Sequence, residues 1–134
     1  MNKNHLSAHV GQYALLKNTD NKVLLLERAR SKTWSLPGGR LNDDEECDLA
    51  LLRELKEELN LDCTNPKPFG VNILKDSYQT KYCVYFTLDY SSLSTLKISS
   101  EHSNFGWFDL EEIKSLNVED EKIRKIVLDF LITN

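Results

Sequence analysis

The sequence from Trp34 to Leu61, WSLPGGRLNDDEECDLALLRELKEELNL, decides how the rest of the chain is interpreted. It opens with a Pro-Gly-Gly turn, runs through an acidic loop and enters a segment rich in leucine and glutamate. Glu54, Glu57 and Glu58 are spaced i, i+3 and i+4, so on a helix they share about a third of the circumference. The leucines fall on a different arc: Leu52, Leu55 and Leu59. The stretch therefore predicts a helix with one packing face and one face that gathers three carboxylates.

Two interpretations of the acidic face stand side by side. Like charges at i, i+4 destabilise an isolated helix by about 0.2–0.5 kcal/mol, which Arg53 and Lys56 partly offset. The face is either a solvated helix surface or a site for a divalent cation. Oxygen ligands of this kind suit Mg²⁺ or Mn²⁺. The three glutamates by themselves leave both interpretations open.

The residues around these glutamates follow a longer pattern. Five residues separate Gly39 from Glu45, and seven more precede Arg53, after which the sequence reads RELKEELNL. This resembles the Nudix box, G-x5-E-x7-R-E-U-x-E-E-x-G-U, where U is aliphatic. Asn60 stands where the box has its last glycine, and asparagine is the usual second choice for a left-handed residue at a helix end. The chain thus resembles small, single-domain, MutT-like Nudix hydrolases.

The resemblance implies roles for the box residues. It implies that Glu54, Glu57 and Glu58 are catalytic and bind metal, together with the carbonyl of Gly38. It also implies a structural clamp, in which Glu45 pairs with Arg53 and holds the acidic loop against the helix.

A second run, E-H-x-x-x-x-W-F from Glu101 to Phe108, also resembles the family. It makes Glu101 a candidate fourth carboxylate, either as a metal ligand or as the general base. Which carboxylate is the base stays open. His102, a lone histidine in sequence, is expected to be exposed or simply hydrogen-bonded.

Three residues are weaker candidates for substrate binding. Arg28 and Arg30 belong to a cationic segment that either is a solvated loop or reaches a substrate phosphate. Tyr78 follows the box by 17 residues, near a tyrosine that accompanies dinucleoside polyphosphate hydrolysis in some Nudix subfamilies.

Hydrophobic alternation predicts the remaining elements. Strands are expected at His9–Lys17 and Val23–Glu27, joined as a hairpin across residues 18–21. After a turn at residues 65–68, a second hairpin is expected from Phe69–Lys75 and Lys81–Tyr90. Glu119–Ile132 reads as an amphipathic packing helix. This is an α+β pattern, and the resemblance implies a Nudix-type α/β/α sandwich with a mixed sheet and a loop-helix-loop catalytic box, in one domain spanning residues 1–134.

Composition limits the possible partners. The net charge of −4 provides no long-range attraction to nucleic acid or to an anionic membrane, and no apolar run is long enough to span a bilayer. Three cysteines without C-x-x-C spacing predict free thiols in a reducing, cytoplasmic setting. Cys47 has no histidine nearby in sequence and is not expected to be a nucleophile.

The combined expectation is an enzyme that uses Mg²⁺, or alternatively Mn²⁺, to hydrolyse the pyrophosphate bond of a small nucleoside diphosphate-X substrate. A nucleoside triphosphate, cleaved to the monophosphate and pyrophosphate, is favoured by the small size of the chain. A dinucleoside polyphosphate or nucleotide-sugar hydrolase is the alternative, and an inactive nucleotide-binding module is the alternative of another class. Whether the protein is a monomer or a homodimer stays open.

Overall fold

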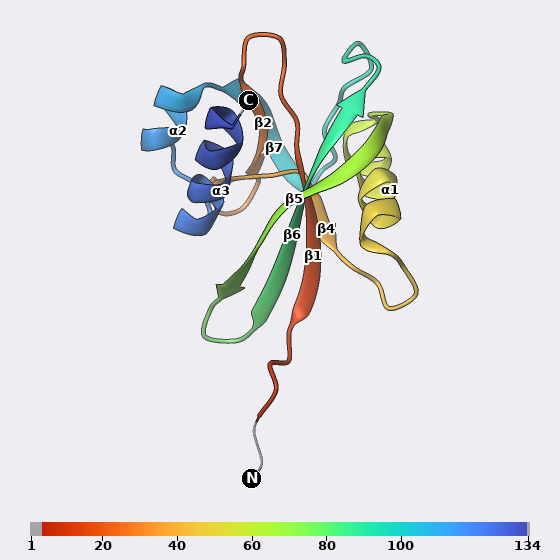
Figure 1. Cartoon of the computed structure of the whole chain (residues 1–134). Coiled ribbons are helices and arrows are strands. Elements are labelled where there is room, and N and C mark those ends of the chain that lie inside the picture. The colour runs from red at the N-terminus through yellow and green to blue at the C-terminus, as the bar shows by residue number, and fades with distance from the viewer. Residues whose placement is uncertain (1–3, 134) are drawn as a thin grey trace.

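The computed structural model describes residues 4–133, and its strands form two sheets at the centre of the molecule (Figure 1). The four-stranded sheet has the order β4 (Gly38–Arg40), β1 (His9–Leu15), β6 (Thr80–Tyr90) and β5 (Cys63–Lys75). The three-stranded sheet has the order β3 (Trp34–Ser35), β2 (Val23–Arg28) and β7 (His102–Phe108). Strands β1 and β6 are parallel while their other neighbours are antiparallel, so the larger sheet is mixed.

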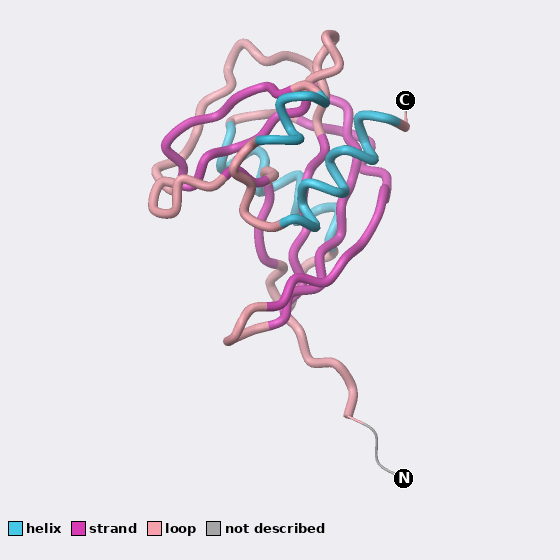
Figure 2. Tube along the Cα trace, turned by 90° about the vertical axis from the view of Figure 1, so that its left-hand side faces the viewer, coloured by secondary structure: helices cyan, strands magenta, loops and turns pink. Residues whose placement is uncertain are grey.

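Helices cover the sheets from two sides. Helix α1 (Cys47–Leu59) lies on one side, and helices α2 (Leu110–Ser115) and α3 (Glu121–Ile132) lie on the other, as Figures 1 and 2 show. Neighbouring residues on each strand face opposite layers, because side chains alternate along a strand. On β2, Leu24 and Leu26 pack with α1, whereas Val23 and Leu25 pack with α2 and α3. The α+β sandwich with a mixed sheet is therefore confirmed.

The predicted hairpin of the first two strands is wrong. Strand β1 pairs with β4 and β6, whereas β2 pairs with β3 and β7 in the other sheet. Only their adjoining ends touch, through a bridge between Lys17 and Val23 and a hydrogen bond from the Leu24 N–H to the Leu16 carbonyl. Both strands are apolar on two faces, and separate sheets give each of them two neighbours and two covered faces.

Two predicted turns also differ from the structure. Residues 65–68 lie inside β5, whose pairing with β6 is irregular on both sides of Lys67–Pro68. The Pro-Gly-Gly segment is a step between sheets: β3 belongs to one sheet, and β4 starts at Gly38 in the other. The φ of Gly38 is 142°, and a Cβ there would collide with the backbone of β1. Glycine is required because only a residue without a Cβ can come this close.

The helix ends follow the expected chemistry. Asn60 caps α1 in the left-handed conformation with φ 53°, which explains how asparagine serves where the box has glycine. Helix α3 starts two residues later than predicted, after its N-cap Asp120, and its predicted apolar face is buried: Ile123, Ile126, Val127, Phe130 and Leu131.

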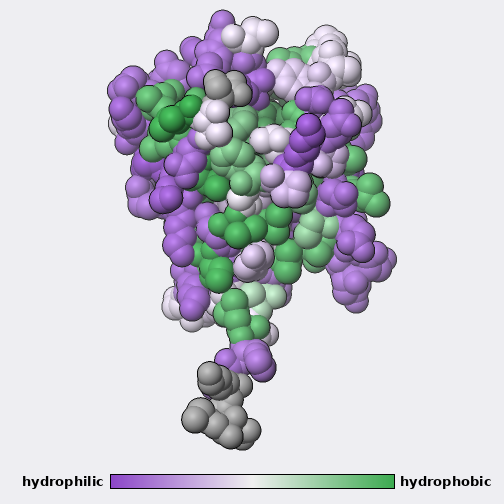
Figure 3. Space-filling model, in the orientation of Figure 1, coloured by the Kyte–Doolittle hydropathy of each residue, from purple (hydrophilic) through white to green (hydrophobic). Residues whose placement is uncertain are grey.

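Figure 3 shows hydrophilic residues over most of both flanks of one face and hydrophobic residues mainly near its middle. Among residues 4–133, no helix combines the length and apolar character needed to cross a membrane.

Candidate active site

An open groove of about 470 Å³ brings together the carboxylates that the sequence singled out. Its walls come from β4, α1 and the loop before β7. The five predicted metal ligands all line it: Gly38, Glu54, Glu57, Glu58 and Glu101. Residues that are 63 positions apart in sequence, Gly38 and Glu101, thus share one site.

A hydrogen bond and close packing hold the Glu54 side chain in place in the groove. It is 9% exposed, and the side-chain amide of Gln12 donates to its Oε1 at 2.6 Å. Gln12 is fully buried and lies opposite Gly39 in the pairing of β1 with β4. A Cβ on Gly39 would collide with Glu54 Oε2. Gln12 and Gly39 together fix the position of this carboxylate.

Sequence reasoning missed Gln12. It shares one face of β1 with Val10, Ala14 and Leu16, and this polar residue on an otherwise apolar face was a usable signal. Buried polar groups in folded proteins are mostly paired. The Gln12 amide nitrogen pairs with a charged group 42 residues away, whereas its Oε1 has no hydrogen-bond partner among the described residues.

No basic side chain among the described residues offsets the burial of the Glu58 carboxyl group. Its Oε2 is buried and has no hydrogen-bond partner among the described residues. Burial, followed by the charge of Glu54, raises the pKa of Glu58 to about 8, and Glu101 and Glu57 add to the effect. Burial also raises the pKa of Glu54, although the Gln12 hydrogen bond opposes this. A divalent cation would relieve both penalties, so the donor set fits a hard metal ion.

Arg53 ties the acidic loop to α1. Its guanidinium donates to both oxygens of Glu45, at 2.7 and 2.8 Å, and to Glu57 at 2.6 Å. These contacts raise the pKa of Arg53 and lower that of Glu45. The pair implied by the resemblance is thus present as a bidentate contact, and Glu57 shares the same cation.

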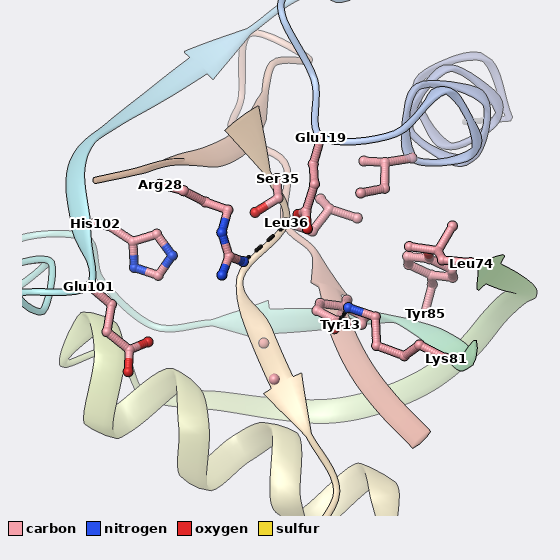
Figure 4. Close-up of a pocket in the computed structure, with 13 residues that line it drawn as sticks. Tyr13, Arg28, Ser35, Leu36, Leu74, Lys81, Tyr85, Glu101, His102 and Glu119 are labelled. Atoms are coloured by element: carbon pink, nitrogen blue, oxygen red, sulfur yellow. Dashed lines mark hydrogen bonds and ion pairs between the residues drawn. The ribbon is translucent and has the colours of Figure 1, made fainter. Parts of the chain in front are cut away.

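Glu101 enters the groove from the turn just before β7. Figure 4 shows its side chain pointing toward α1, with His102 and Arg28 beside it. One ligand atom from each of Glu58, Glu101 and His102 lies within 4.8 Å of the others. Burial, and then the charge of Arg28, lowers the pKa of His102, and its Nδ1 has no partner among the described residues.

A smaller pocket of about 70 Å³ adjoins the groove, and the two share Gly38, Gly39 and Glu101. Tyr13 and Tyr85 contribute aromatic walls, and two cations reach it (Figure 4). Arg28 pairs with Glu119 at 3.8 Å, and Lys81 Nζ donates to the Tyr13 hydroxyl at 2.7 Å. Sequence reasoning did not single out Lys81, which lies near the start of a predicted strand.

The other weak candidates lie outside the groove itself. Arg30 lines an adjoining hollow, which shares Ser100 and Glu101 with the groove. Tyr78 is 95% exposed in the turn between β5 and β6 and lines neither the groove nor the pocket. Cys47, Cys63 and Cys83 are free thiols, and burial raises the pKa of Cys47, which agrees with its not being a nucleophile.

The model of the NUDIX domain matches residues 7–130 of this chain. The chain belongs to the Nudix hydrolase family. Two curated relatives show how similar the chain is to other members of the family. The uncharacterized Nudix hydrolase YvcI of Bacillus subtilis is 33% identical over 102 residues, which cover 73% of this chain and 65% of YvcI. The nucleoside triphosphatase NudI of Escherichia coli is 28% identical over 128 residues, 87% of each chain.

Structural similarity points the same way. The crystal structure of the MutT protein from Methanosarcina mazei superposes with a TM-score of 0.82, covering 94% of this chain and 96% of that one at 26% identity. This supports a MutT-like Nudix fold. The chain spans 65% of YvcI and down to 10% of other curated relatives.

Proposed function

We propose that this Nudix protein is a metal-dependent pyrophosphohydrolase that cleaves a nucleoside triphosphate into a nucleoside monophosphate and pyrophosphate. The observation that carries the proposal is the convergence of Glu54, Glu57, Glu58 and Glu101 on one groove that opens beside a pocket with aromatic and cationic walls. The proposal includes Mg²⁺, or alternatively Mn²⁺, as cofactor, a single domain over residues 1–134, and a cytoplasmic location.

The metal would be held by the carboxylates and by the Gly38 carbonyl. Bound there, it would supply charge neutralisation for the phosphates and an acidified water. Gln12 and Gly39 would keep Glu54 in one orientation, while Arg53 would do the same for Glu45 and Glu57. Either Glu101 or a box glutamate would accept the proton of the attacking water as general base.

The pocket supports a nucleotide as substrate. Arg28 and Lys81 would pair with phosphate oxygens close to the carboxylate groove, and the Tyr13 and Tyr85 side chains would form the apolar wall for the nucleoside. Arg30 lines a hollow together with Arg28 and Glu101 and is a further candidate for phosphate binding. The relative NudI is named a nucleoside triphosphatase, which agrees with this choice of substrate.

The alternatives have less support. Tyr78, the residue that suggested dinucleoside polyphosphates, lies outside the groove and the pocket. An inactive binding module is disfavoured because each box carboxylate is present and lines the groove or is paired with Arg53.

The test is product release from a nucleotide panel with Mg²⁺, with Mn²⁺ and with chelator. The panel contains common and oxidised triphosphates, a dinucleoside polyphosphate, ADP-ribose and a nucleotide sugar. We expect metal-dependent pyrophosphate release from a triphosphate. Release of orthophosphate alone, hydrolysis that persists in chelator, or a preference for another compound would contradict the proposal, and no turnover by a folded, metal-binding protein would favour the binding module.

A further inference from the structure

We propose that His102 joins Glu58 and Glu101 as a third protein ligand, in a metal locus that takes a divalent transition ion such as Co²⁺ in preference to Mg²⁺. The inference rests on the metal dependence in the proposed function, and it adds a ligand that the Nudix box does not contain. It concerns ion binding and not the hydrolytic step.

The three side chains converge from two separate elements. Glu58 comes from the last turn of α1, whereas Glu101 lies in the turn just before β7 and His102 is the first residue of β7. Their ligand atoms lie within 4.8 Å of one another. Donor atoms around one ion at bond lengths of about 2.1 Å lie about 3.0–4.2 Å apart. Small side-chain rotations are therefore enough to bring all three onto one ion.

Two polar atoms at this point have no partner. Glu58 Oε2 and His102 Nδ1 are buried, and neither has a hydrogen bond to the described residues. Buried polar groups are nearly always paired, because an unpaired one costs about 1–3 kcal/mol. Both atoms belong to the same three-residue group, and a bound cation gives that group the compensation it lacks.

The other carboxylates of the groove are already engaged. Glu54 accepts the hydrogen bond of Gln12, and Glu57 accepts that of Arg53. Glu58 makes no ion pair with a lysine, arginine or histidine of residues 4–133 at 4.0 Å or less. Glu58 is therefore the box glutamate without a basic partner, and with Glu101 and His102 it forms a second locus directly beside Glu54.

The imidazole decides which ion the second locus prefers. Mg²⁺ selects oxygen ligands and gains little from a nitrogen donor. Imidazole suits transition ions, and affinity for mixed nitrogen and oxygen sites rises from Mn²⁺ to Co²⁺ and beyond. His102 is thus a selectivity residue that distinguishes this locus from one made of carboxylates alone.

The test is direct binding of Co²⁺ and of Mg²⁺ to the whole, nucleotide-free protein, by calorimetry and by the visible absorption of Co²⁺. We expect His102→Gln to weaken Co²⁺ binding at least about tenfold, with loss of the imidazole-dependent absorption, and to change Mg²⁺ binding by less than about threefold. Glu101→Gln is expected to weaken both ions. The matched control is His9→Gln, because His9 is an exposed histidine at the start of β1.

Three results would overturn the proposal: no Co²⁺ binding by the wild-type protein, unchanged Co²⁺ affinity in His102→Gln, or equal losses for Co²⁺ and Mg²⁺. Thermal unfolding of each variant establishes that it is folded. Because hydrolysis is not measured here, failure of this locus and failure of the nucleotide assay are separate outcomes.

Discussion

Helices α1 and α3 are similar in length and amphipathic character but use their polar faces in opposite ways. On α3, Glu121 pairs with Arg124 and Lys125 pairs with Asp129, in contacts that keep at least one partner in solvent. On α1, Glu54 is 9% exposed, and Glu58 turns a buried oxygen toward the groove without a partner. Helix α3 leaves these charges in solvent, whereas α1 withdraws Glu54 and one oxygen of Glu58 from water while Glu57 stays exposed.

This difference separates charges that solvent and an opposite charge stabilise from charges that the proposed metal ion would stabilise. Exposed pairs like those of α3 contribute about 0–1 kcal/mol and are screened by salt. Burying a carboxylate costs free energy unless it is paired. In helix α1 the burial of Glu54 and Glu58 carries this free-energy cost. The leucines on its other face stabilise the helix, since Leu51, Leu55 and Leu59 are fully buried.

The largest expected effect comes from the carboxylates of α1. Glu57→Gln combined with Glu58→Gln should lower the turnover of the best substrate by more than the roughly 10–100-fold that loss of a supporting residue costs, because two charges of the proposed metal site disappear. The measurement is kcat at saturating Mg²⁺. Glu121→Gln on α3 is the matched control and should leave kcat unchanged. A double variant that turns over at the full rate would remove these glutamates from the mechanism.

Gln12 should have the next largest effect, because it supports Glu54 without neutralising it. Gln12→Met keeps a similar volume and removes the amide donor, so Mn²⁺ affinity should fall about tenfold. Electron paramagnetic resonance of free Mn²⁺ measures this. Leu15→Met, on the opposite face of β1 in the core beside α3, is the control for general disturbance of the strand. Equal Mn²⁺ affinities in the wild-type protein and Gln12→Met would show that the hydrogen bond from Gln12 to Glu54 has no influence on metal binding.

The smallest effect is a dependence of stability on pH in the metal-free protein. The pKa of Glu58 rises from 4.5 to about 8 on folding, so between these pH values unfolding releases a proton. The stability associated with the protonated carboxyl is complete below about pH 4.5 and is lost as the pH rises toward 8. The pKa of Glu121 is lowered by its hydrogen bond with Arg124, so its stabilisation has the opposite sign and is lost as the pH falls.

Thermal unfolding from pH 5 to pH 8 in chelator tests this sign. The melting temperature of the wild-type protein should fall, relative to that of Glu58→Gln, by a few degrees. Mg²⁺ at pH 8 should stabilise the wild-type protein more than the variant. If the difference between the two proteins is constant across this range, Glu58 does not carry a proton in the folded state.

The buried faces of the helices could be predicted from the sequence, whereas the pairing of the strands could not. Periodicity identified the buried face of α3 and both covered faces of β2, because helix and strand periods are local properties. It paired β1 with β2 because they are neighbours in sequence. In the structure, β1 lies beside β6, whose pairing starts with His9 opposite Lys81. Contacts between residues so far apart in sequence depend on how the two sheets pack between the helices, and no local sequence pattern specifies that packing.

The features of the candidate site also fall into two groups, those that the sequence predicts and those that only the folded structure shows. The sequence by itself determined the family, the carboxylates of α1 and the Glu45–Arg53 pairing, because fixed spacings within one loop and one helix carry that information. Only the tertiary structure brought Gln12 against Glu54 and placed His102 beside Glu58, since these contacts join residues about 40 positions apart. The physical reason is that burial and unpaired polar atoms arise only when separate elements pack, and they decide how each carboxylate is held.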